Sequence, residues 1–78
     1  MRYFFHFRRG DGRVVDDEGT ELPDLDAVRA EAFKAAREMM CHAIMDGRDV
    51  SGRTFEIADE EAKVILLVPF ADAIRQAA

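Results

Sequence analysis

Residues 23–47 read PDLDAVRAEAFKAAREMMCHAIMDG, and this stretch decides the fold. It has no Gly or Pro between Pro23 and Gly47, and Ala is its commonest residue. Because Ala is the strongest helix former, the stretch predicts one helix of about 21 residues. Asp24 is placed to cap the first free amides, and Gly47 is placed to end the helix.

The apolar side chains of this helix form a central stripe and a flank on a helical wheel. The stripe, which predicts the face that packs on a sheet, contains Leu25, Val28, Ala32, Ala35, Ala36, Met39 and Ala43. Phe33, Met40 and Ile44 form the flank, about 100° from the centre of the stripe. The apolar arc is wider than one sheet needs, so we expect another chain to cover the flank.

Strands are predicted on both sides of the helix. Residues 2–7 are dense in aromatic side chains, and residues 13–15 resume an extended chain after the turn around Gly10 and Gly12. Residues 53–58 alternate between apolar and polar, whereas residues 63–68 are apolar on both sides. In the first strand, alternation puts Tyr3, Phe5 and Phe7 on one face of the sheet. It puts Phe4 and His6 on the other face.

The chain therefore predicts an α+β fold of order β-β-α-β-β, in which one long helix packs on one face of an antiparallel sheet of about four strands. Residues 1–78 are expected to form a single small domain with its core at about 2–70. Residues 71–78 are a short extension, and Phe70, Ala73 and Ile74 would share one side of a short terminal helix. The second face of such a sheet stays open.

Composition bounds the function. A chain of 78 residues buries only about 60% of its unfolded surface, so a partner subunit would add stability. The net charge of −5 argues against binding to a phosphate backbone, and a single Cys excludes an internal disulfide.

The longest apolar run, residues 64–70, is too short to cross a bilayer, and no leader segment is visible. We expect a cytoplasmic protein that does not contact a membrane and keeps Cys41 reduced.

Several short segments resemble a known family of small bacterial proteins that is classed as a domain of unknown function. The segments are Arg2-Tyr3-Phe4-Phe5-His6, Asp17-Glu18-Gly19, Glu21-Leu22-Pro23-Asp24, Ser51-Gly52-Arg53 and Val64 to Phe70. The resemblance covers about residues 2–70 and implies a small domain that stands alone. It carries no assigned activity, substrate or catalytic residue onto these positions.

Titratable side chains give no catalytic or metal-binding pattern. His6 is expected to be a structural histidine, and Cys41 and His42 point about 100° apart on the helix, so they cannot share one ion. The acidic loop from Asp16 to Glu21 lacks the spacing of a calcium loop and is expected to be a solvated turn with helix-capping charge. We predict no catalytic residue, metal or cofactor.

The leading hypothesis is a non-enzymatic protein-interaction module that forms a homodimer. Its interface would come from the helix flank or from an apolar open sheet face or edge, and the candidates are Phe33, Met40, Ile44, Phe4, Ile65 and Leu67. The alternative is a nucleic-acid-binding or antitoxin-like regulatory module that uses the N-terminal arginines Arg2, Arg8, Arg9 and Arg13. A small enzyme ranks last, because it needs His6, Asp11 and Asp16 to converge in a pocket.

Overall fold

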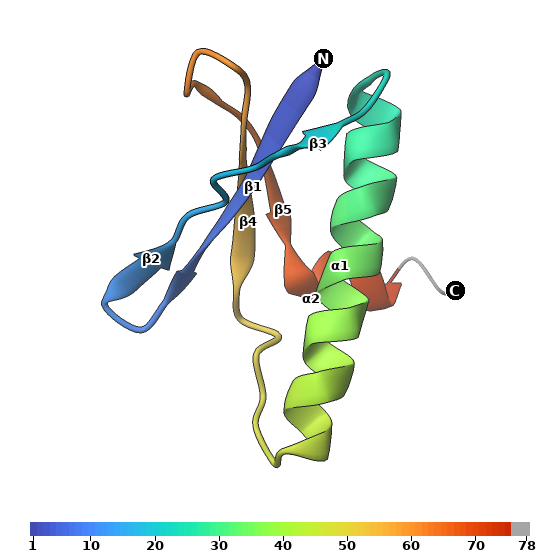
Figure 1. Ribbon diagram of the computed structural model, residues 1–78. Helices are drawn as coiled ribbons and strands as arrows, with labels where there is room; N and C mark the ends of the chain where they lie inside the picture. The colour runs from blue at the N-terminus through green and yellow to red at the C-terminus, as the bar shows by residue number, and fades with distance from the viewer. Residues whose placement is uncertain (76–78) are drawn as a thin grey trace.

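The computed structural model describes residues 1–75 as one helix laid across one face of an antiparallel sheet (Figure 1). Its elements follow the predicted order and are β1 (Arg2–Arg9), β2 (Gly12–Val14), β3 (Thr20–Glu21), α1 (Leu25–Met45), β4 (Thr54–Ala58), β5 (Val64–Pro69) and α2 (Phe70–Arg75). The predicted fold class is confirmed. Residues 76–78 of the expected terminal extension lie outside the described residues.

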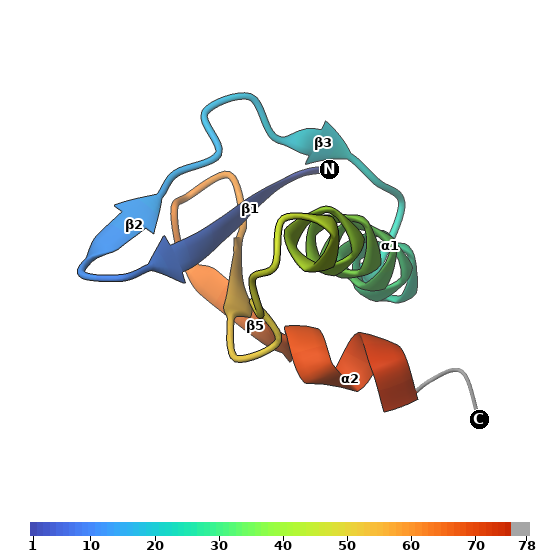
Figure 2. The same ribbon diagram turned by 90° about the horizontal axis from the view of Figure 1, so that it is seen from below.

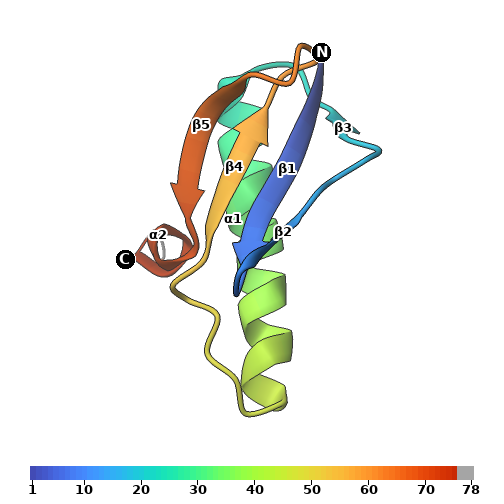
Figure 3. The ribbon, with the colours of Figure 1, turned by 90° about the vertical axis from the view of Figure 1, so that its left-hand side faces the viewer.

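The sheet has the strand order β2-β1-β4-β5, and the short strand β3 pairs with the start of β1. All four pairings are antiparallel; Phe7 lies opposite Val14 on β2 and opposite Phe55 on β4. Seen face-on, the sheet lies in front of α1, and the face toward the viewer carries no element (Figure 3). The open second face of the sheet is therefore confirmed for the described part of the chain.

The termini of α1 follow from the side chains and glycine that the sequence places there. The Asp24 carboxylate accepts a hydrogen bond from the Ala27 N–H at 2.9 Å, which satisfies one of the free amides of the first turn. At the other end Gly47 has a φ of +77°, and the Arg48 N–H donates to the Ala43 carbonyl at 2.8 Å. This left-handed glycine and its backbone bonds form a Schellman cap, so the helix ends where the sequence predicts.

The core lies between the sheet and α1 and extends under α2. The predicted aromatic face is confirmed: Tyr3 is buried, and Phe5 and Phe7 meet the ring of Phe55 edge to face. Phe70 is fully buried, with its ring centroid 4.8 Å from that of Phe55. Phe70 thus holds α2 against β4, and α2 packs beside α1 (Figure 2).

The buried face of α1 is rotated from the predicted stripe toward the predicted flank. Leu25 is exposed, whereas Phe33 and Met40 belong to the core with exposed fractions of 9% and 7%. The reason is α2, which packs on α1 within the same chain. Of the flank that we expected another chain to cover, only Ile44 is exposed.

The open face of the sheet differs from the apolar surface that we expected. Glu56 lies in the middle strand β4 and pairs with two arginines, at 3.1 Å from Arg13 and 3.6 Å from Arg8. A bulge at Ile57/Ala58 leaves Ile65 without a partner on β4, and Ile65 packs against the core instead of joining Leu67 on the open face. Phe4 does lie on this face and is half-buried.

The outer edge of β1 is occupied along its length. Near the end of β1, Phe7 and Arg9 pair with β2, and near its start Tyr3 pairs with β3. Between these two ladders the Phe5 N–H donates to the Asp16 carboxylate at 3.1 Å. The side chain of Asp16 therefore supplies the acceptor that a strand would otherwise provide, and β1 offers no free edge to another chain.

Candidate functional site

The carboxyl end of α1 carries an apolar groove. It has a volume of about 430 Å³ and runs between α1, the loop that follows it and α2. Its lining is Arg37, Met40, Cys41, Ile44, Met45, Asp49, Val50, Ser51 and Ile74. Two members of the predicted flank, Met40 and Ile44, thus contribute to one continuous surface.

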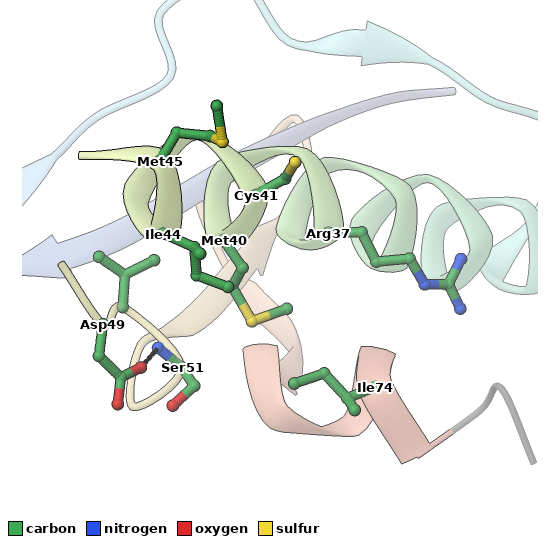
Figure 4. A pocket seen from close by; sticks show the side chains of 9 residues that line it. Arg37, Met40, Cys41, Ile44, Met45, Asp49, Ser51 and Ile74 are labelled. Carbon is green, nitrogen blue, oxygen red and sulfur yellow. Dashed lines mark hydrogen bonds between the residues drawn. The ribbon is translucent and has the colours of Figure 1, made fainter. Parts of the chain in front are cut away.

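Large apolar side chains stand exposed around this groove. The exposed fractions are 70% for Ile44, 83% for Met45 and 59% for Ile74. In Figure 4, Ile74 points from α2 toward Met40, and Met40 and Ile44 project from α1 into the space beside α2. A concentration of exposed apolar surface around a hollow is typical of a contact site for another molecule.

Each end of the groove carries a charged side chain. Arg37 donates from Nε to the Ala73 carbonyl at 3.1 Å, and its guanidinium lies 5.9 Å from the centre of the Phe33 ring. Asp49 lies at the opposite end, where its carboxylate accepts the Ser51 N–H at 2.9 Å (Figure 4). Hydrogen bonds from the N–H and the side chain of Ser51 hold the pKa of Asp49 below its usual value. The Asp49 carboxyl is therefore ionised at neutral pH.

His6 and Asp16 come together, but not as an acid and base pair. The Asp16 backbone N–H donates to His6 Nδ1 at 3.0 Å, so the neutral ring carries its proton on Nε2. The Asp16 carboxylate is turned away to accept the N–H groups of Phe5, Glu18 and Gly19. This arrangement satisfies His6 within the chain, as expected of a structural histidine, and Asp11 lies apart at the tip of the first hairpin.

Asp16 was expected to belong to a solvated acidic turn, yet it is half-buried and holds the loop against β1. Partial burial opposes its ionisation, but the N–H groups of Phe5, Gly19 and Glu18 donate to the carboxylate and keep its pKa below the usual value. Within residues 1–75, no three His, Cys, Asp or Glu side chains are grouped as metal ligands. The acidic loop is thus held against β1 by the hydrogen bond between Asp16 and the Phe5 N–H, a contact that the sequence did not indicate.

The four N-terminal arginines do not form one free basic surface. Arg8, Arg9 and Arg13 lie at the end of the first hairpin, whereas Arg2 lies at the start of β1 and donates to the Glu18 carbonyl at 2.8 Å. Arg2, Arg8 and Arg13 each pair with a carboxylate. Phosphate binding would have to displace these carboxylates, so the arrangement does not favour the nucleic-acid alternative.

The comparison with family models gives one match over nearly the whole chain. Residues 2–71 match the model described as Domain of unknown function (DUF6894). The chain belongs to this family. The predicted resemblance to a domain of unknown function is therefore confirmed, and the match includes both hairpins, α1 and the first residues of α2.

The other comparisons add no relative. Neither the curated proteins nor the solved structures contain a match to the chain. In the described part of this member of the family, no helix has the length and apolar character needed to cross a membrane.

Of the residues around the groove, the sequence pattern indicated Met40 and Ile44, as members of the predicted flank. It did not indicate Asp49 or Ile74 as members of the site, because both depend on how the loop and α2 dock beside α1. Ile74 was expected to share one side of a terminal helix with Phe70 and Ala73, yet those two are buried and Ile74 is exposed.

Proposed function

We propose that this chain is a non-enzymatic protein-interaction module that acts as a homodimer, and that the groove at the carboxyl end of α1 is its contact surface. The observation that supports this is the exposure of Ile44, Met45 and Ile74 around one apolar hollow. Burying such side chains in a subunit contact removes apolar area from water, at about 25 cal/mol per Å². The small core of a 78-residue chain gains from this added burial.

The groove supports the proposal better than the sheet does. The open sheet face has a charged centre formed by Glu56 with Arg8 and Arg13, and these groups would have to lose water in a contact. The edge of β1 is closed by β2, Asp16 and β3. The groove lining, by contrast, is almost wholly apolar between its two charged ends.

The test compares one substitution in the groove with one on the sheet, Ile44→Glu with Leu67→Glu. Both side chains are similarly exposed, at 70% and 60%, so neither change disturbs the core. We expect the mass measured by light scattering to approach that of a dimer as the wild-type concentration rises through the micromolar range. Ile44→Glu should stay monomeric, and Leu67→Glu should behave as the wild type.

Two results would contradict the proposal. A wild-type chain that remains monomeric at high micromolar concentration would exclude the homodimer. A dimer that Leu67→Glu disrupts and Ile44→Glu leaves intact would move the contact surface to the open sheet face.

A further inference from the structure

The groove has opposite charges at its two ends. The Arg37 guanidinium lies at the end next to α2, and the Asp49 carboxylate lies at the end beyond the last turn of α1 (Figure 4). Neither side chain takes part in an ion pair within the described residues. Each charge is therefore available to a group of opposite charge on another molecule.

A second copy of this chain supplies those opposite charges in the right order. In a two-fold contact the same surface is used by both subunits, and where the axis runs across the groove each end of one groove faces the opposite end of the partner groove. Arg37 then meets Asp49 of the partner subunit, and Asp49 meets the partner's Arg37. A head-to-head arrangement would bring like charges together, which opposes association.

The apolar part of the surface is also self-complementary. It combines a hollow with protruding side chains, and the exposed Ile44 and Met45 come from the same turns of α1 that form its wall. A contact between two such surfaces can place the protruding groups of each copy against the hollow of the other. A partner of unrelated sequence would need its own matching pattern of shape and charge.

Building on the proposed homodimer, we infer that the two copies meet with their α1 helices antiparallel across a two-fold axis, and that Arg37 of each copy forms an ion pair with Asp49 of the partner subunit. The two ion pairs lie at the ends of the contact, and Met40 and Ile44 lie between them. The charges set the orientation of the two copies, and the apolar groups supply the burial.

Complementation between two charge-reversed variants tests this pairing. Arg37→Glu and Asp49→Lys each place two like-charge pairs in a homodimer, so we expect each to dimerise at least about 100-fold more weakly than the wild type. In a one-to-one mixture both pairs are again opposite in charge. The mixture should therefore form a heterodimer with near wild-type affinity, as measured by sedimentation equilibrium or native mass spectrometry.

Glu38→Lys is the matched control for Asp49→Lys. Glu38 is an exposed carboxylate on α1 that does not line the groove, and its reversal changes the net charge by the same amount. We expect Glu38→Lys to dimerise as the wild type does. Its heterodimer with Arg37→Glu restores only one of the two opposite-charge pairs, so it should be weaker than the heterodimer with Asp49→Lys. Equal rescue by Glu38→Lys and Asp49→Lys would show an effect of net charge alone and would overturn the pairing.

Arg37 also holds α2 through the Ala73 carbonyl, so each variant is checked for folding by circular dichroism. If Arg37→Glu does not fold, Asp49→Lys decides the question, because it must weaken the dimer and lose that effect as salt rises. The pairing is overturned if neither variant weakens the dimer, or if the mixture does not recover the dimer affinity. Either result leaves the proposed homodimer in place. A monomeric wild type overturns both.

Discussion

The Asp16 carboxylate accepts a hydrogen bond from the Phe5 N–H at 3.1 Å, between the two short ladders that β1 forms with β2 and β3. One side chain thus joins the acidic loop to the strand that carries Tyr3, Phe5 and Phe7. The same carboxylate accepts the N–H groups of Glu18 and Gly19, which shapes the loop around it.

Replacing Asp16 should destabilise the fold and expose the edge of β1. Asp16→Ala leaves three N–H groups without their acceptor, and we expect the free energy of unfolding to fall by about 1–3 kcal/mol. Hydrogen exchange at the Phe5 amide should become faster. Urea denaturation and exchange measurements check both effects. Asp17→Ala, on the exposed neighbouring residue, is the control and should change stability by less than about 0.5 kcal/mol.

The Asp16 carboxylate should make the free energy of unfolding decrease at acidic pH. Its pKa is lower in the folded chain than in the unfolded chain, because three backbone N–H donors outweigh its partial burial. As the pH falls, the unfolded chain therefore binds a proton at this carboxylate before the folded chain does. The contribution of Asp16 to the free energy of unfolding is complete above the ordinary aspartate pKa, and it is lost as the pH drops through the pKa of Asp16 in the folded chain. Between about pH 5 and pH 2, Asp16→Asn should lose less stability than the wild type. Parallel acid limbs for the two proteins would contradict this.

Gly19→Ala should be more damaging than the same change at another left-handed glycine. Gly19 has a φ of +70°, and an added Cβ would lie 2.9 Å from the Tyr3 carbonyl oxygen and 2.8 Å from Arg2 Cγ. Gly47 has a φ of +77°, with no atom within 4 Å of such a Cβ. Gly47→Ala should therefore show only the conformational penalty of about 1 kcal/mol, and Gly19→Ala should exceed it by at least about 1 kcal/mol. Equal losses would contradict the close approach of the loop to β1.

Phe70→Ala should release α2 and uncover the groove lining. Phe70 is fully buried against Phe55, and its loss should lower the free energy of unfolding by about 3–5 kcal/mol. Met40 should then become more reactive toward peroxide, whereas Met45, which is already exposed, should react at an unchanged rate. Peptide mass spectrometry reads the two methionines separately in one sample. Met40 that stays protected would show that α2 does not cover it.

Local sequence patterns predicted the elements of this fold well. The Ala-rich stretch without Gly or Pro defines α1, and alternation in residues 2–7 correctly divides Tyr3 and Phe5 from Phe4 and His6. The helix and the two faces of the strand follow from residues that are close together in the sequence, so they can be predicted from the sequence alone.

The parts that could not be predicted depend on docking between distant segments. Nothing near Asp16 indicates that its carboxylate reaches Phe5, and nothing near Phe33 and Met40 indicates that α2 covers them. Ile65 was misplaced for a related reason, because a bulge changes the face of a strand without leaving a clear mark in an apolar run. The groove arises from the same docking, so only its residues on α1 were visible in the sequence.

Pro69 ends the outermost strand β5 on one side of the sheet, and the three-residue strand β2 bounds the other. Proline has no N–H to give to an incoming strand, and three residues form too short a template for stable pairing. A concentrated solution of the folded chain should therefore resist conversion to cross-β fibrils. Both edges of the sheet are therefore poor templates for an added strand from another copy.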